Sequence, residues 1–370
     1  MSDTPFNPST PEATPHRRRP RYAGKHPRRF EEKYKEHDPQ RHVETVARVL
    51  AAGKTPAGSH RPIMVAEILT ALAPQPGAVA VDCTLGYGGH AHELLQRLQP
   101  GGRLLGLDAD PLELPRATAR LRAAGFGPEQ FTALRSNFAG LPQALVSCEL
   151  QGADIILADL GVSSMQLDNP ARGFSTKADG PLDMRMNPQR GQPAAALLAR
   201  CTPTALAGLL ADHADDPRAV ELASALAGRT LSTTRELAEA VRAALPRLNK
   251  EETDLTVRRV FQALRIAVND EFGALDMLLR HLPACLNPGG RVAILTFHSG
   301  EDRRVKRAFE AGLRRGDYAE IAREVIRPGP AERRDNPRSS PAKLRWALRP
   351  AQPAESCVPA SSGLNSAEEG

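Results

Sequence analysis

The chain has 370 residues, of which 41% are hydrophobic and 25% charged, and its formal net charge at pH 7 is +6. This length is sufficient for one large domain with an insertion. No run of 18 apolar residues occurs, so we expect no membrane span, and the first residues lack the pattern of a signal peptide. The five cysteines are scattered without Cys-x-x-Cys spacing, which is typical of buried thiols in a reducing cytoplasm rather than of a metal site.

The basic excess lies at the N-terminus. Residues 1–58 hold 12 Lys and Arg against 7 Asp and Glu, with prolines and no apolar period, so we expect a disordered, basic, proline-rich arm. Its arginine clusters, with Tyr22 and Phe30 among them, could bind nucleic-acid phosphates and stack on bases. A solvated tail without a partner explains the same composition. We also expect a disordered tail at 351–370.

Order is expected from about residue 60, where strands and helices begin to alternate. Apolar runs of four to six residues read as buried strands, and apolar residues at helical spacing read as helices between them. Such alternation is typical of an α/β fold with a doubly wound, mostly parallel sheet. In chain order, we expect a helix at 63–72, a strand at 78–83, a helix at 89–99, a strand at 103–108, a helix with Pro111 in its first turn, and strands at 131–135, 153–158, 291–296 and 344–348.

The alternation stops after the strand at 153–158. Residues 165–192 are rich in Gly, Pro, Asp and Arg and are expected to form a loop. Ala-rich stretches with helix-start signals predict helices at 203–211, 216–228 and 234–245. These segments indicate a helical insertion within the α/β domain.

The main domain is expected to resume with one long helix over 255–281. Ser299 is expected to cap the helix that follows the strand at 291–296. We therefore predict a main domain formed by 59–165 and 255–350, with an inserted loop and helical segment at 166–254.

A glycine turn joins the first strand to its helix in the run Asp82-Cys-Thr-Leu-Gly-Tyr-Gly-Gly-His90. Glycines let a ligand approach the backbone closely. Asp108 ends the next strand, about twenty residues on, where such folds bind the ribose of an adenosine cofactor. The Asp82 carboxylate would repel the pyrophosphate of NAD but suits a sulfonium that carries an amino group. Charge therefore favours S-adenosylmethionine over a dinucleotide.

Asp159 ends the strand at 153–158, on the edge of the sheet where the cofactor is expected. Methyl transfer from a sulfonium is an in-line displacement, so positioning contributes much of the rate. A nucleobase amine is a weak nucleophile, and an acceptor bonded to its N–H would activate it and then take its proton. Asp159 is our candidate for this catalytic role. The alternative is that it orients the cofactor or caps a turn.

Several motifs stand in the order found in one known family. Over residues 60–349 the chain resembles the bacterial RsmH (MraW) family of small-subunit rRNA cytosine-N4 methyltransferases. The segment Asp-Gly-Pro-Leu-Asp-Met-Arg-Met at 179–186 is the most specific, since it is not generic methyltransferase sequence. The other motifs are Gly86–His90, Asp159–Asp168, Arg172–Ser175, Phe261–Ile266, Val268-Asn269, Phe297–Ser299 and Glu301–Arg303.

The resemblance implies a Rossmann-like class I S-adenosylmethionine-dependent methyltransferase fold whose helical insertion recognises the substrate. It implies methylation of the exocyclic amine of one decoding-region cytidine of 16S rRNA, on the small ribosomal subunit in the cytoplasm. A homodimer is compatible with the sequence, and no metal ligands are indicated. The cofactor contacts implied by the resemblance are Gly88, Gly89, His90, Asp108, Phe138, Asp159 and Gln166.

Three alternatives use the same fold. A DNA or free-nucleotide amino-methyltransferase usually carries Asn/Asp-Pro-Pro-aromatic after its fourth strand, which Asp159-Leu-Gly-Val162 lacks. A non-enzymatic ribosome assembly factor that kept the fold is expected to have lost residues of the cofactor site. An NAD dehydrogenase is disfavoured because the Asp82 carboxylate would repel a pyrophosphate. Departures from the family, such as Met165 for proline and Gly300 for leucine, concern RNA docking more than the cofactor.

Overall fold

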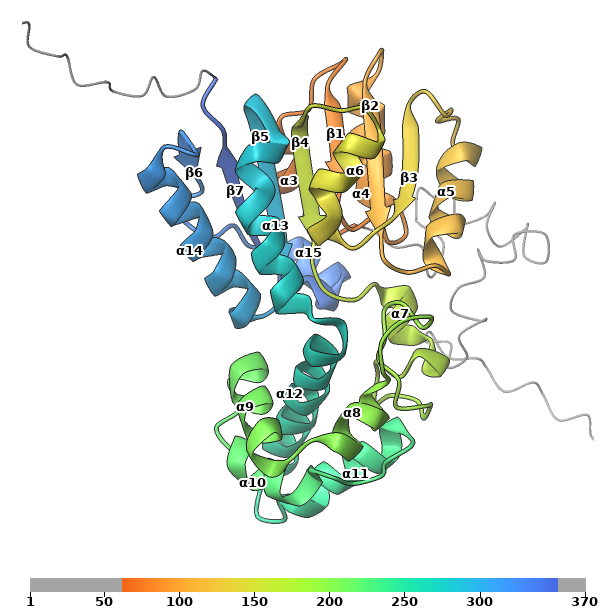
Figure 1. Cartoon of the computed structure of the whole chain (residues 1–370), viewed down its shortest axis with the longest axis vertical. Coiled ribbons are helices and arrows are strands. Elements are labelled where there is room, and N and C mark those ends of the chain that lie inside the picture. Colours follow the sequence, from red (N-terminus) through yellow and green to blue (C-terminus); the bar gives the residue numbers. More distant parts are fainter. Residues whose placement is uncertain (1–61, 352–370) are drawn as a thin grey trace, which may run out of the picture. The chain divides into compact units, whose positions relative to one another are not determined.

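The computed structural model describes residues 62–351, so the predicted arm at 1–58 and nearly all of the predicted tail lie outside the described residues. These residues form a seven-stranded sheet with the order β3-β2-β1-β4-β5-β7-β6 (Figure 1). The first five strands are parallel, whereas β7 is antiparallel to both β5 and β6. The predicted doubly wound, mostly parallel sheet is confirmed. The strands are β1 (Val79–Asp82), β2 (Arg103–Asp108), β3 (Phe131–Arg135), β4 (Ala153–Asp159), β5 (Leu286–Thr296), β6 (Glu320–Ile321) and β7 (Lys343–Leu348).

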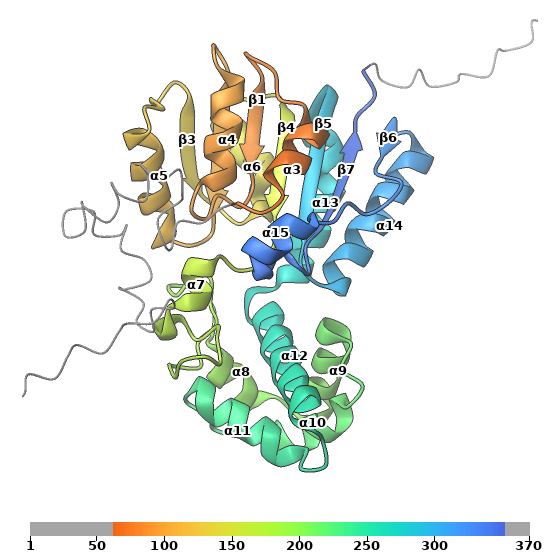
Figure 2. The same ribbon diagram turned by 180° about the vertical axis from the view of Figure 1, so that it is seen from behind.

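Helices cover both faces of the sheet because the central strands are apolar on both sides. Alternate residues point to opposite faces: Val81 and Ile156 enter one core, whereas their neighbours Ala80 and Ile155 enter the other. Figures 1 and 2 show these two faces in turn. One face carries α6 (Leu141–Ser147), α13 (Glu271–Cys285) and α14 (Ser299–Arg315), and the other carries α3 (Val65–Leu72), α4 (Gly89–Leu98) and α5 (Glu113–Ala123).

The insertion has a hydrophobic core of its own, in which Leu206, Leu222 and Leu237 are fully buried. This core extends into α12 as far as Leu264, beyond residue 254 where the predicted insertion ends. The division of the chain into functional domains stays a prediction. The helices of this core are α8 (Ala194–Arg200), which was not predicted, α9 (Pro203–Ala214), α10 (Ala219–Leu226), α11 (Thr234–Ala244) and α12 (Lys250–Asn269).

The single helix expected over 255–281 is wrong, because the chain forms two helices there. Asp270 adopts a left-handed conformation with φ 49° and caps the end of α12, and α13 begins at Glu271. A left-handed residue interrupts the helical hydrogen-bond ladder. The sequence offered no glycine or proline to mark this break.

Three other local predictions need correction. Residues 165–192 are not all loop, since they include most of α7 (Ser164–Asp168) and η3 (Pro170–Arg172). The residue that caps α14 is His298 rather than Ser299, because the His298 side chain and Glu301 form a reciprocal capping box. Pro111 lies just before α5 instead of inside its first turn.

Three short elements complete the described part of the chain: η2 (Phe138–Gly140), α15 (Pro330–Asp335) and η4 (Pro337–Ser339). Within residues 62–351, no helix combines the length and the apolar character that crossing a membrane requires.

Candidate active site

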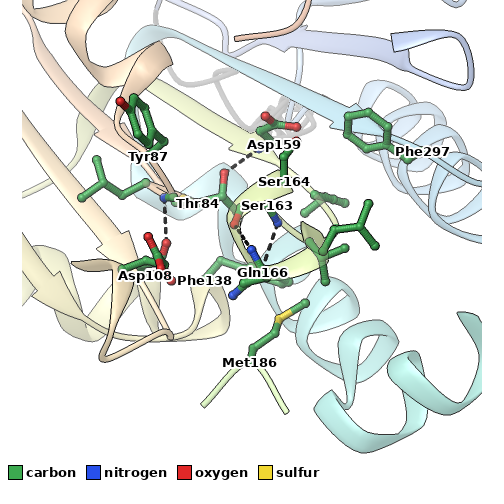
Figure 3. Close-up of a pocket in the computed structure, with 18 of the residues that line it drawn as sticks. Thr84, Tyr87, Asp108, Phe138, Asp159, Ser163, Ser164, Gln166, Met186 and Phe297 are labelled. Atoms are coloured by element: carbon green, nitrogen blue, oxygen red, sulfur yellow. Dashed lines mark hydrogen bonds between the residues drawn. The ribbon is translucent and has the colours of Figure 1, made fainter. Parts of the chain in front are cut away.

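A pocket of about 500 Å³ opens at the carboxyl ends of the parallel strands (Figure 3). Parallel strands bring their carboxyl ends to one edge of the sheet, so residues far apart in the chain meet there. Asp108 is the last residue of β2, Asp159 is the last residue of β4, and Phe138 lies just beyond the end of β3. Of the predicted site residues, all except Gly88 line the pocket, namely Gly89, His90, Asp108, Phe138, Asp159 and Gln166.

The glycine turn lies against the pocket through Gly86, whose φ of 48° is unfavourable for other residues. Gly88, with φ 82°, precedes the first residue of α4 and packs towards α5, where a Cβ atom would lie 3.4 Å from Leu121. Gly88 thus shapes the turn. Its predicted contact with the cofactor stays a prediction.

The Asp108 carboxylate is held by two backbone amides. Gly86 donates to Oδ2 at 2.7 Å and Asp110 donates to Oδ1 at 2.8 Å. Burial raises the pKa of Asp108 to about 6, although these hydrogen bonds act in the opposite direction. An ionised carboxylate has about four acceptor positions, so capacity remains for two hydroxyl donors. This arrangement suits the adjacent hydroxyl groups of a ribose.

Asp159 is positioned by the turn after β1 as well as by its own strand. Its backbone amide donates to Thr84 Oγ1 at 2.6 Å, and its side chain is 28% exposed in the pocket. Oδ2 lies 3.4 Å from His90 Nε2. Burial alone would lower the pKa of His90, but Asp159, with Asp82 and Glu93, outweighs it and raises that pKa. The carboxylate of Asp159 thus favours the protonated form of the neighbouring His90.

Asp82 lies below this pair and does not line the pocket. It is 1% exposed, and its Oδ1 accepts a hydrogen bond from the Thr84 amide at 3.1 Å. Burial raises the pKa of Asp82 to about 6, even though His90 lowers it. Asp82 therefore acts on the site through charge, beneath the residues that a ligand would touch.

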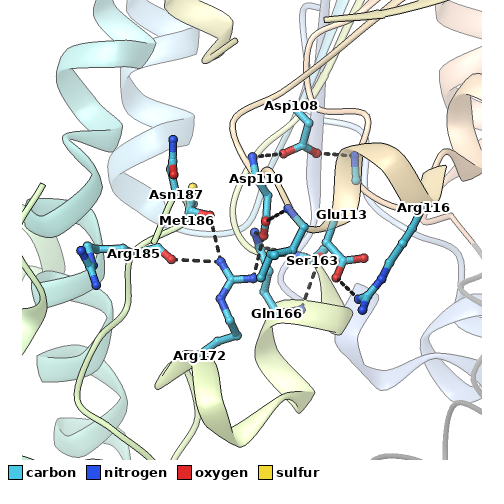
Figure 4. Close-up of polar contacts among 12 residues, drawn as sticks. Asp108, Asp110, Glu113, Arg116, Ser163, Gln166, Arg172, Arg185, Met186 and Asn187 are labelled. Atoms are coloured by element: carbon cyan, nitrogen blue, oxygen red, sulfur yellow. Dashed lines mark hydrogen bonds and ion pairs between the residues drawn. The ribbon is translucent and has the colours of Figure 1, made fainter. Parts of the chain in front are cut away.

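Gln166 belongs to a buried polar network that ties α7 to the segment after β2 (Figure 4). Its Oε1 accepts from the Ser163 amide at 3.0 Å, and its Nε2 donates to Asp110 Oδ2 at 2.8 Å. Arg172 Nη1 donates to the same oxygen at 2.7 Å. Asp110 is fully buried, so this pairing satisfies a carboxylate that water cannot reach.

Sequence reasoning missed Asp110 and gave Arg172 no role. Arg172 also donates to the carbonyl oxygens of Arg185 and Met186, at 3.0 and 2.8 Å. Asn269 completes the junction, accepting from the Met186 amide at 2.7 Å. Met186 lines the pocket, so this network sets the position of one pocket wall. The only signal in the sequence was that the motifs containing Arg172, Arg185 and Asn269 occur together.

The Asp-Gly-Pro motif has a packing explanation. A Cβ atom on Gly180 would overlap the carbonyl oxygen of Pro170, and one on Gly173 would overlap that of Pro181. The two segments therefore pass each other at a distance that only glycine allows. Recognition of the substrate by the insertion that contains this loop stays a prediction.

A second charged group lines the pocket from α12, α13 and α14. Arg265 donates from Nε and Nη2 to the two carboxylate oxygens of Glu271, at 2.8 and 2.9 Å. Glu301 accepts from the Phe297 amide at 2.8 Å, and His298 Nε2 lies 3.1 Å from its other oxygen. These side chains are not among the predicted site residues.

The corner formed by Asp108, Asp159 and Gly86 fits S-adenosylmethionine. It offers acceptors for ribose hydroxyls, negative charge for a cationic tail and an open backbone turn. In the part of the chain that the structure describes, no group of three or more His, Cys, Asp or Glu side chains could hold a metal ion.

Similarity to known proteins identifies the family of the chain. Residues 57–349 match the model of the MraW methylase family. The chain is 48% identical over 341 residues to ribosomal RNA small subunit methyltransferase H 2 of Alkaliphilus metalliredigens, covering 90% of this chain and 97% of that protein. It is 45% identical over 343 residues to ribosomal RNA small subunit methyltransferase H 1 of Lachnoclostridium phytofermentans, covering 90% and 93%. The chain therefore belongs to the MraW methylase family and is an S-adenosylmethionine-dependent methyltransferase.

Proposed function

We propose that this protein methylates the exocyclic N4 amine of one decoding-region cytidine of 16S rRNA in the small ribosomal subunit. The observation that carries the proposal is the extent of the match, since the chain covers 97% of a relative named as a small-subunit ribosomal RNA methyltransferase. A cytoplasmic location follows from this substrate. Formation of a homodimer stays a prediction.

In this proposal, Asp108 accepts hydrogen bonds from the ribose hydroxyls of the cofactor, while Gly89, Phe138 and Gln166 form the surrounding wall. S-adenosylmethionine supplies an electrophilic methyl group when bound. The contribution of the protein is to hold that group in line with the attacking nitrogen and to keep water away.

Asp159 then acts on the acceptor. Its part-exposed carboxylate accepts a hydrogen bond from the N4 amine, which raises electron density on the nitrogen, and it takes the proton that methylation releases. His90 holds the other face of this carboxylate from the buried side, with Nε2 3.4 Å from Oδ2. The competing role for Asp159 is to bind the cofactor, and the two roles predict different kinetic effects.

The test is a transfer assay with labelled S-adenosylmethionine and small subunits from cells that lack their own cytosine-N4 enzyme. Label should appear as N4-methylcytidine at a single decoding-region position. Small subunits that already carry the methyl group are the matched control and should accept none. Cofactor binding without transfer would favour another RNA, a DNA or an assembly role, and would contradict the proposal.

A further inference from the structure

Three charged side chains in the pocket wall take no part in the mechanism above. Arg265 comes from α12, Glu271 is the first residue of α13, and Glu301 lies in the first turn of α14. Their side chains are 16%, 8% and 3% exposed, and all three residues line the pocket. Buried charges need partners, so such a group at a ligand pocket requires an explanation.

The guanidinium of Arg265 is only partly used. Its Nε and Nη2 donate to Glu271 in a two-point fork, which fixes the plane of the group. Within residues 62–351, Nη1 has no hydrogen-bond partner. Arginine carries five N–H donors, so the fork leaves donors on a fixed guanidinium in the pocket wall.

The charge of the group indicates which ligand those donors fit. Glu271 and Glu301 supply two carboxylates against the single charge of Arg265, and the nearby His298 adds at most one more positive charge. Burial would raise the pKa of Glu301, but His298 and Arg265 outweigh it and keep that pKa low, so Glu301 is ionised. The net charge of these four side chains is therefore zero or negative. A phosphate would be disfavoured here, whereas a neutral group with acceptor atoms would be accepted.

We propose that Arg265 recognises the acceptor edge of the target cytosine, with Nη1 donating to O2 or N3 of the ring. This inference rests on the proposed function and adds a specificity-determining residue to it. Cytosine carries O2, N3 and the N4 amine along one edge, so Arg265 and Asp159 would contact the two ends of the same edge. Uracil presents an N–H at position 3, which would leave the donors of Arg265 facing another donor.

The experiment combines a protein variant with an altered base. Small subunits are reconstituted with ligated 16S rRNA that carries cytidine, 2-thiocytidine or 3-deazacytidine at the target position. Transfer is measured with the wild type and with Arg265→Met. Because Arg265→Met leaves Glu271 buried without its partner, the double variant Arg265→Gln/Glu271→Gln is measured as well. Arg345→Met is the matched control, since Arg345 is a buried, ion-paired arginine that does not line the pocket.

For subunits with cytidine at the target position, Arg265→Met should lower kcat/KM by about 10- to 100-fold. The affinity for S-adenosylmethionine should change less than about twofold. At least one analogue should lower transfer by the wild type about tenfold, and that analogue should have no further effect in either Arg265 variant. Arg345→Met should respond to the analogues as the wild type does.

Equal analogue effects in the wild type and in both Arg265 variants would overturn the inference, because a merely structural arginine gives that result. A wild type that fails to methylate reconstituted subunits with unmodified cytidine at the target position would instead overturn the proposed function. The two failures are therefore distinguishable.

Discussion

The two sides of the pocket are built in different ways. On the cofactor side, strand ends and one glycine turn place Asp108 and Asp159. Two backbone amides hold Asp108, and Thr84 in the turn after β1 holds Asp159. On the insertion side, the wall depends on side chains that reach across long stretches of chain, such as Arg172 to Asp110 and Asn269 to the backbone amide of Met186. The first side follows from the topology of the sheet, whereas the second depends on a buried network that must be complete.

The largest expected effect tests the catalytic assignment on the cofactor side. Asp159→Asn keeps the shape of the side chain but removes the charge opposite His90 and the capacity to take a proton. Single-turnover transfer should slow by about 10²- to 10⁴-fold, while cofactor affinity measured by calorimetry should change only a few-fold. Small and equal changes in both quantities would remove Asp159 from the catalytic role.

The next effect concerns the network on the insertion side. Arg172→Met leaves the fully buried carboxylate of Asp110 without its ion-pair partner, so unfolding free energy in urea should fall by about 3–5 kcal/mol. Arg172→Met/Asp110→Asn should recover part of the loss. Arg185→Met, which breaks the more exposed pair with Asp183, should cost less. Equal losses for Arg172→Met and Arg185→Met would mean that the buried network does not hold this wall.

Asp108→Ala is expected to change cofactor affinity more than turnover, which is the reverse of the expectation for Asp159→Asn. It removes an acceptor for the ribose and also leaves the Gly86 amide without its partner. The dissociation constant for S-adenosylmethionine should rise by about 10- to 100-fold, while turnover at saturating cofactor should fall much less. A larger effect on turnover than on affinity would exchange the roles given to Asp108 and Asp159.

A smaller effect than that of Asp108→Ala is expected for the dependence of cofactor affinity on pH. Burial raises the pKa of both Asp82 and Asp108 from 3.8 to about 6, and a cationic ligand with hydroxyl donors favours the ionised forms. The affinity for S-adenosylmethionine should therefore rise with pH by at most about tenfold per pH unit for each group. It should level off above about pH 6. Asp108→Asn should make the rise less steep. A flat profile from pH 5 to 7.5 would contradict this assignment.

The same shifts affect folding stability with the opposite sign. The pKa values of Asp82 and Asp108 in the folded protein exceed the ordinary value of 3.8. Their contribution to the free energy of unfolding is therefore fully present below pH 3.8 and is lost as the pH rises through about 6. Urea denaturation between pH 4 and 7 measures this loss. A loss that persists in Asp82→Asn/Asp108→Asn would have to come from other groups.

The smallest effect is expected from the basic arm. Deleting residues 1–58 removes 12 Lys and Arg, so binding to small subunits should weaken mainly at low salt. The slope of log affinity against log salt concentration should become less steep. An unchanged slope would mean that the arm does not contact RNA phosphates.

The cofactor side of the site could be predicted from the sequence because its signals are local. A buried strand, a glycine turn and an amphipathic helix follow one another over Val79–Leu98, and the acids at 108 and 159 end their strands. Parallel pairing of β1 with β2 and β4 then brings those acids together. Hydrophobic period and turn chemistry are properties of neighbouring residues, so one sequence is enough to detect them.

Only the tertiary structure decided the rest. The break at Asp270, the buried Asp110–Arg172 pair and the fork between Arg265 and Glu271 leave no local pattern. The two charge pairs depend on which buried polar groups the packing brings together. Asp110 and Arg172 are 62 positions apart, so no sequence period indicates their contact. Local chemistry therefore determined where the cofactor corner lies, and the pairing of distant buried charges determined the wall that faces it.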